Sequence, residues 1–167
     1  LLKGSHFYMN INEYQNYHET KAHTSAEFPY NTYLCSIPLD FPGVPLHWHD
    51  ELELVVIKRG QGFVSVDFDK RLVHSGDIII IPPRCLHAIE QDDTFKMEYE
   101  NIIFKPDLLS SGANDLCMIQ YIVPLLDGSL PIEYFLTPAL GSFEALRIVS
   151  DRLTLSALIR HLDGSLL

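Results

Sequence analysis

Between residues 31 and 104 the sequence consists of short β-prone runs separated by turn residues, and this pattern constrains the fold more than any other feature. Runs rich in Val, Ile, Tyr and Phe alternate with Gly, Pro and Asp, as they do in β-sandwiches and β-barrels. Gly60-Gln61-Gly62 is expected to form the first tight turn and Asp67-Phe68-Asp69-Lys70 the next. The sequence therefore predicts a mainly β barrel, with strands at 32–35, 46–57, 62–68, 72–74, 78–81 and 96–104.

Composition and charge argue against several classes of protein. A chain of 167 residues with 47% hydrophobic and 20% charged residues is sufficient for one soluble domain. The net charge of −10 argues against DNA binding by this chain itself, because phosphates require a basic surface. No apolar run approaches the roughly 18 residues needed to cross a bilayer, so no membrane partner is expected. The three widely spaced cysteines suggest no disulfide framework and fit a reducing cytoplasm.

The stretch from residue 46 to residue 57 carries the chemistry. On a strand, alternate side chains share a face, so two imidazoles and two carboxylates are expected to point one way and Trp48 the other, into core or interface packing. Imidazole nitrogens with a carboxylate oxygen suit zinc, nickel, iron or manganese. His87 is the candidate for a further imidazole. The predicted ligand-binding residues are His47, His49, Glu51, Glu53 and His87.

Two spacings connect these residues to a known fold. The pattern H-x-H-x3-E-x6-G ends at Gly60, and G-x5-P-x-R-x2-H-x3-Q starts at Gly76. Together they resemble the two cupin signatures. The resemblance implies a double-stranded β-helix (jelly-roll) barrel followed here by carboxy-terminal α-helices. It also implies that the metal ligands are His47, His49, Glu53 and His87.

Three positions depart from the cupin pattern. Arg84 stands where the second signature usually has Gly, Gln91 stands where it usually has Asn, and Gly43 lies closer to His47 than usual. Two alternatives therefore stay open for the four residues: a divalent transition-metal site, or a hydrogen-bonded polar cluster without metal. No cofactor is required by the sequence, and no residue is assigned a catalytic role.

A narrower resemblance is carried by residues 45–54, Gly60-Gln61-Gly62, Ser75-Gly76-Asp77-Ile78 and residues 81–87. Together these segments are similar to the amino-terminal sensing and dimerisation domain of AraC-type bacterial transcription regulators. The resemblance implies a small-molecule effector inside the barrel, a homodimer, and DNA binding through helix-turn-helix units that this chain does not contain. A sugar is the default effector of the family, and an aromatic acid is the alternative. The rival interpretations are a metal-dependent cupin enzyme, either an isomerase or a dioxygenase, and a sugar-binding module without regulatory attachment.

The chain divides into four parts. Residues 1–8, which precede Met9, are expected to be an expression-vector remnant, and residues 9–30 form an amino-terminal arm. Residues 31–110 form the barrel and 111–167 a helical dimerisation segment. Apolar residues at three- and four-residue spacing predict a helix over 114–126. A second helical region carries two apolar stripes, more than one intramolecular contact needs, and predicts dimerisation through Leu146, Val149, Leu153, Leu155, Leu158 and Leu162.

Overall fold

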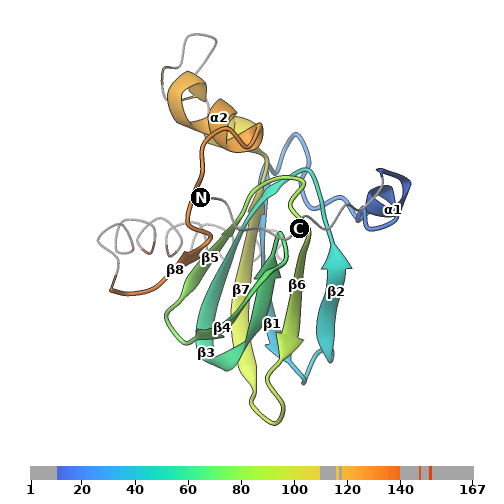
Figure 1. Ribbon diagram of the computed structural model, residues 1–167, viewed down its shortest axis with the longest axis vertical. Helices are drawn as coiled ribbons and strands as arrows, with labels where there is room; N and C mark the ends of the chain where they lie inside the picture. The colour runs from blue at the N-terminus through green and yellow to red at the C-terminus, as the bar shows by residue number, and fades with distance from the viewer. Residues whose placement is uncertain (1–10, 110–115, 117, 140–146, 148–150, 152–167) are drawn as a thin grey trace, which may run out of the picture.

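The computed structural model describes residues 11–109, 116, 118–139, 147 and 151, and it shows a mainly β domain (Figure 1). The predicted fold class is confirmed, since the strands pair antiparallel throughout. The elements in chain order are α1 (Ile11–Gln15), β1 (Tyr30–Ile37), β2 (Gly43–His47), β3 (Leu52–Val66), β4 (Asp69–His74), β5 (Ile78–Ile81), β6 (His87–Gln91), β7 (Met97–Phe104), a 3-10 turn (Pro106–Leu109), a π-helical turn (Met118–Ile122), α2 (Val123–Leu126) and β8 (Phe135–Leu136).

The strands form two faces of a barrel that share β3. One sheet has the order β1-β7-β3-β5-β8, and in the other β2 pairs with β6, which pairs with β3, which pairs with β4. The first half of β3 pairs with β5 and β7, whereas its second half pairs with β4 and β6. The long strand thus crosses from one sheet to the other and joins them.

The tight turn expected at Gly60-Gln61-Gly62 is wrong, because β3 runs through these residues as one strand of 15 residues. Gly60 has φ +76°, and a Cβ there would lie 1.8 Å from the Lys96 carbonyl oxygen. Its pairing with β7 is irregular just before Gly60. The glycine therefore allows a bend within the strand and not a reversal of the chain.

The second predicted turn is confirmed. β3 and β4 form a hairpin in which Val66 pairs with Asp69. The two residues between them, Asp67 and Phe68, both have positive φ, at 47° and 67°. Positive φ at both central residues is the geometry of a two-residue turn whose twist matches the strands on either side.

The predicted strand over 46–57 is two elements. β2 ends at His47 and β3 begins at Leu52, with a short connection between them. From Leu52 onward the expected alternation holds: Leu52, Leu54 and Val56 pack in one apolar cluster with other residues of the first sheet. Val55 and Ile57 belong to a second cluster, which draws on both sheets and so fills the barrel interior.

The sequence analysis did not predict two of the strands, β6 and β8, which lie outside all of the expected strands. The expected helix is only partly covered by the described residues. Within the predicted helix over 114–126, the described residues 118–126 are helical, and Pro124 lies in the first turn of α2. The proposed dimerisation residues and residues 1–8 lie outside the described residues. No helix in the described part of the chain has the length and apolar character that crossing a bilayer needs.

Candidate functional site

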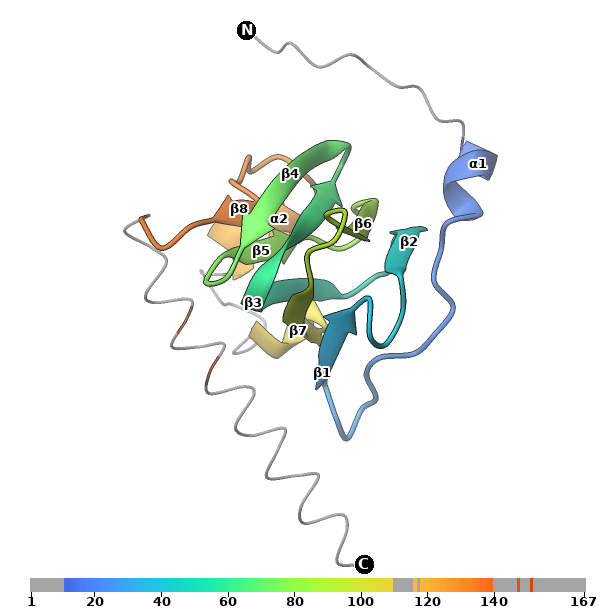
Figure 2. The same cartoon turned by 90° about the horizontal axis from the view of Figure 1, so that it is seen from below.

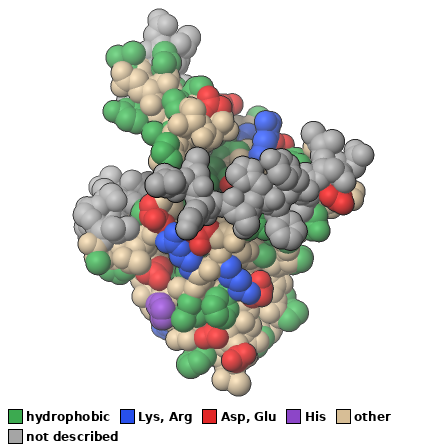
Figure 3. Space-filling model, in the orientation of Figure 1, with side chains coloured by type: hydrophobic (Ala, Val, Ile, Leu, Met, Phe, Trp, Pro, Cys, Tyr) green, Lys and Arg blue, Asp and Glu red, His purple; other side chains and the backbone are tan. Residues whose placement is uncertain are grey.

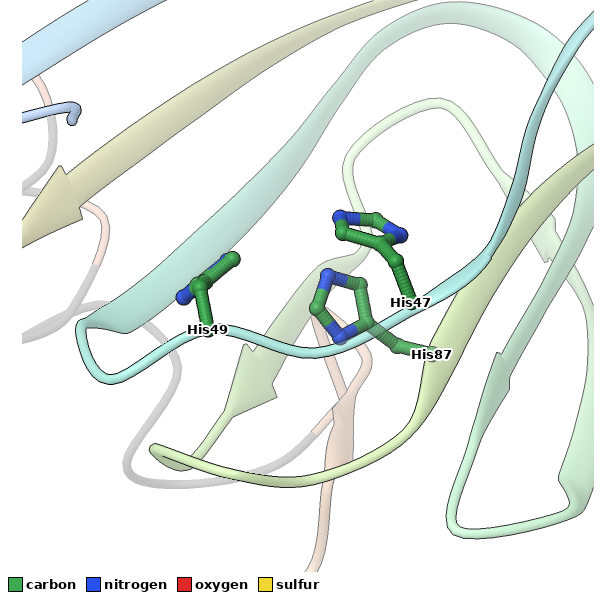
Figure 4. Close-up of side chains that lie close together, drawn as sticks. All are labelled: His47, His49 and His87. Carbon is green, nitrogen blue, oxygen red and sulfur yellow. The ribbon is translucent and has the colours of Figure 1, made fainter. Parts of the chain in front are cut away.

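Three histidines meet at one end of the barrel. His47, the last residue of β2, stands opposite His87, the first residue of β6, and their ring centroids are 4.0 Å apart. His49 follows two residues later and lies with its ring 5.1 Å from that of His87 (Figure 4). One nitrogen from each ring lies within 4.8 Å of the other two. Strand pairing thus brings together residues 40 positions apart in the chain.

Glu53, the second residue of β3, lies beside two of the three rings. Its carboxylate Oε2 lies 2.9 Å from His49 Nε2 and 3.3 Å from His87 Nε2, and the side chain is 2% exposed. Burial alone would raise the pKa of Glu53, but the hydrogen bond from His49 and the proximity of His87 outweigh it and hold that pKa far below its usual range. The group is therefore a carboxylate anion within an apolar barrel.

Backbone carbonyls orient the three rings. The Nδ1 atoms of His47, His49 and His87 lie 2.9, 3.2 and 2.9 Å from the carbonyl oxygens of Pro45, Glu51 and Cys85. Because a carbonyl oxygen only accepts, each Nδ1 carries the proton that it donates, and a neutral ring then has its lone pair on Nε2. Carbonyl partners of this kind commonly fix the ring orientation of metal-binding histidines.

The pKa values of His47 and His49 are shifted in opposite directions. Burial lowers the pKa of His47, and the neighbouring His87 lowers it further. Burial also disfavours charge on His49, but the hydrogen bond and the negative charge of Glu53 outweigh it and raise the pKa of His49. His49 therefore favours a second proton, on Nε2, which it donates to the Glu53 carboxylate.

This donor set fits a divalent transition metal. His87 Nε2 is buried and has no hydrogen-bond partner within the described part of the chain. That nitrogen lies 3.3 Å from a Glu53 carboxylate oxygen without the alignment of a hydrogen bond. A cation would satisfy both, and imidazole nitrogens with one carboxylate suit zinc, nickel, iron or manganese. The residues that would hold such an ion are His47, His49, Glu53 and His87.

The cluster lines a cavity of about 280 Å³ in the barrel interior. Apolar side chains from β2, β6 and β7 form one part of its wall, and hydroxyl, thiol and amide groups from β1 and β7 form another. The amino-terminal arm, residues 11–29, supplies the remaining part. The lining residues are Glu19, Lys21, His23, Tyr33, Cys35, Phe41, Val44, His47, His49, Glu53, His87, Ile89, Tyr99, Asn101 and Ile103.

Trp48 attaches the arm to the barrel. The arm runs from α1 past β2 to β1 (Figure 2). The rings of Tyr14 and His18 stack on the indole at centroid distances of 4.8 and 4.1 Å. The indole Nε1 donates to the Tyr14 carbonyl, and the backbone of Trp48 exchanges hydrogen bonds with Tyr17 and Glu19. Trp48 thus faces away from the histidine cluster, as alternation predicted, and its packing partner is the arm.

The amino-terminal segment was expected to be an arm over the pocket, but the arm residues that line the cavity were not predicted. Glu19, Lys21 and His23 all line it, and His23 is 8% exposed. They lie at a spacing of two residues, so an extended arm presents all three on one side. This alternation of polar residues is the signal in the sequence that could have identified them.

The structure places Glu51 outside the cavity lining. It lies in the connection between β2 and β3, where strand alternation does not apply. Its backbone carbonyl accepts from His49 Nδ1, and its carboxylate lies 3.7 Å from the same nitrogen and accepts from the Thr24 hydroxyl. Glu51 is therefore placed to orient a ring of the cluster and the arm above it.

None of the three departures from the cupin pattern is among the residues that line the cavity. Arg84 has φ +66°, the left-handed region that glycine adopts without strain. Its guanidinium pairs with Asp50 at 2.9 Å, and its backbone N–H donates to the His49 carbonyl. Gln91 donates to the Phe95 carbonyl. The departures thus replace no residue of the candidate ligand set.

Comparison with known proteins agrees with this geometry. The family of AraC-like ligand-binding domains matches residues 31–162. Two HTH-type transcriptional regulators of Bacillus subtilis, described as uncharacterised, are similar: YdeC is 32% identical over 58% of this chain and 34% of its own length, and YbfI is 26% identical over 43% and 26%. The chain thus spans about a third or less of these relatives.

Among solved structures, a cupin protein from Bacteroides fragilis is 20% identical, with a TM-score of 0.44 over 59% of this chain and 95% of that protein. The family match covers most of the chain, including the barrel and all four residues of the histidine cluster. The chain therefore belongs to the family of AraC-like ligand-binding domains.

Proposed function

We propose that this chain is the effector-sensing domain of an AraC-type transcription regulator, and that a small molecule binds in the barrel cavity. The observation that carries the proposal is the cavity itself. Apolar walls with a few convergent polar groups are the usual form of a small-molecule site, and here part of the wall is an arm that is separate from the barrel. A sensor, and not an enzyme, is proposed because the matching family is one of ligand-binding domains.

The effector would act by shifting the populations of two arrangements of arm and barrel. Such a shift requires different affinities for the two arrangements, because a ligand that binds both equally changes nothing. DNA would be bound by other parts of a cytoplasmic, homodimeric regulator. The net charge of −10 and the interspersed basic and acidic side chains on the face in Figure 3 are consistent with this division.

The test is a thermal-shift screen of sugars and aromatic acids, followed by calorimetry on any compound that raises the unfolding temperature. A ligand at 100 times its dissociation constant should stabilise the domain by about 2.7 kcal/mol. Val44→Trp should fill the cavity and abolish the shift, whereas Leu39→Trp, at an exposed position outside the cavity lining, should preserve it. A shift that survives Val44→Trp would place the ligand elsewhere and overturn the proposal.

The second element of the proposal is a divalent transition metal at the histidine cluster. The observation that favours it is the buried His87 Nε2, which has no hydrogen-bond partner among the described residues and lies 3.3 Å from the Glu53 carboxylate. Metal analysis of protein purified without chelators, alongside His49→Ala and native mass measurement, tests it. Near-stoichiometric metal that is lost in His49→Ala would support the site. Wild-type protein that takes up no zinc, nickel, iron or manganese on titration would leave a metal-free polar cluster.

A further inference from the structure

One carboxylate near the histidine cluster comes from outside the barrel. Glu19 Oε2 lies 3.6 Å from His47 Nε2 and 3.0 Å from His23 Nε2. The backbone N–H of Glu19 donates to the Trp48 carbonyl at 2.9 Å, and Trp48 lies between His47 and His49 in sequence. The arm is therefore fixed at the point where its carboxylate reaches the cluster.

A directed chain of hydrogen bonds holds this carboxylate. The Glu19 carboxylate only accepts, so His23 Nε2, 3.0 Å away, donates to it. A neutral His23 then accepts at Nδ1 from the Tyr33 hydroxyl at 3.3 Å, and that hydroxyl accepts from the Asn31 amide at 3.1 Å. His23 is thus the partner that orients Glu19, and one further lone pair of Oε2 is left to face His47.

The contact between Glu19 and His47 is too long for a hydrogen bond, and both of its atoms are of kinds that bind transition metals. His47 Nδ1 donates to the Pro45 carbonyl, which leaves Nε2 as the nitrogen available to a metal, 3.6 Å from the Glu19 carboxylate. His87 Nε2 and the Glu53 carboxylate lie in a similar contact at 3.3 Å. One carboxylate from the barrel and one from the arm therefore each lie beside a nitrogen of the three-histidine cluster. A cation would bind nitrogen and oxygen in both contacts.

We propose that Glu19 is a metal-site carboxylate carried by the arm, so that a divalent transition metal held by the histidine cluster also holds the arm against the barrel. The inference rests on the metal element of the proposed function and adds a residue to it. Because the coupling between two equilibria is reciprocal, arm docking strengthens metal binding by the same factor by which metal strengthens arm docking.

Trypsin provides a direct measure of arm docking, since Lys21 is exposed and is the only Lys or Arg between residues 11 and 30. Cleavage after Lys21 is followed by mass spectrometry, with saturating Zn²⁺ or with chelator, in the wild type and in Glu19→Gln. Zn²⁺ should slow cleavage of the wild type about tenfold and leave the rate for Glu19→Gln unchanged. Zn²⁺ affinity, measured by chelator competition, should fall about tenfold in Glu19→Gln, within the range seen when groups around a metal site are removed.

Glu27→Gln is the matched control, because it removes the same charge from an exposed position of the arm outside the cavity lining. It should behave as the wild type in both assays. Equal Zn²⁺ affinity and equal protection in the wild type and Glu19→Gln would overturn the role of Glu19 while preserving the metal site. Wild-type protein that binds no Zn²⁺ would instead refute the metal element of the proposed function, and the inference with it.

Discussion

Two of the cavities in the described part of the chain differ in how their polar groups are satisfied. The outer cavity, about 460 Å³, lies between the 82–85 turn and residues 125–134. There the Asp67 carboxylate accepts hydrogen bonds from the Cys85 thiol at 3.4 Å and the Tyr134 hydroxyl at 3.3 Å, so donors and acceptor satisfy one another. In the smaller inner cavity, by contrast, the Nε2 atoms of His47 and His87 lie 3.6 and 3.3 Å from carboxylate oxygens without the geometry of a hydrogen bond. Polar groups that a cation would satisfy indicate a ligand site better than cavity volume does.

The largest expected effect comes from removing the barrel carboxylate of the inner cavity. Structural zinc sites bind with about 10–16 kcal/mol, or about 2.5–4 kcal/mol for each of four ligands, so Glu53→Gln should weaken Zn²⁺ binding by about 60- to 700-fold. Calorimetric or chelator-competition titration measures this loss. A loss of only twofold in a folded variant would mean that Glu53 holds no ion. The polar groups of the inner cavity would then satisfy one another, as those of the outer cavity do.

Trp48→Ala should have the next largest effect, because it removes the surface on which the arm packs. Deletion of an indole that stacks on two arm rings should weaken arm docking by about 2–3 kcal/mol. Tryptic cleavage after Lys21 should then accelerate, while thermal unfolding of the barrel changes less. Trp48→Phe is the control, since it keeps an aromatic ring for Tyr14 and His18 and loses only the Nε1 hydrogen bond. Equal cleavage rates in the wild type and Trp48→Ala would show that Trp48 does not hold the arm.

The contrast between barrel and arm also shows what the sequence can predict. The β-barrel followed from the short runs and their turn residues, because strand alternation and glycine conformations are local properties. Convergence of His47, His49, Glu53 and His87 was indicated by two motif spacings, and strand pairing between β2 and β6 accounts for it. These features depend on residues whose neighbours in space are set by regular strands.

The parts that sequence could not predict depend on irregular backbone. Gly60 was expected in a turn because glycines cluster there. In the structure β3 continues through Gly60 and pairs with strands of both sheets, so this glycine lies at a bend within a strand. Glu51 would share a face with Glu53 only if one unbroken strand covered residues 46–57. Glu19 reaches the cluster through stacking and hydrogen bonds at Trp48, and no local pattern specifies where an extended arm lies on a barrel.

In the outer cavity, Asp67→Asn should cost only about 1 kcal/mol of unfolding free energy, the usual net value of a hydrogen bond. The amide oxygen has two lone pairs and can still accept from both Tyr134 and Cys85, so neither donor loses its partner. Zn²⁺ affinity should stay within twofold of the wild type. Denaturant unfolding and metal titration measure the two quantities. If Asp67→Asn weakened Zn²⁺ binding as strongly as Glu53→Gln, the contrast between the cavities would not hold.

The smallest effect is expected at the turn between the two cavities. Arg84 occupies the left-handed region, which costs an L-residue about 1–2 kcal/mol, and Arg84→Gly would relieve that strain. The substitution also adds about 0.5–1 kcal/mol of chain entropy to the unfolded state and removes an exposed ion pair with Asp50 that contributes about 0–1 kcal/mol. These terms nearly cancel, so unfolding free energy should change by less than about 1 kcal/mol and Zn²⁺ affinity should not change. A marked gain in Zn²⁺ affinity in Arg84→Gly, measured by the same titration, would mean that this departure from the cupin pattern does weaken the metal site.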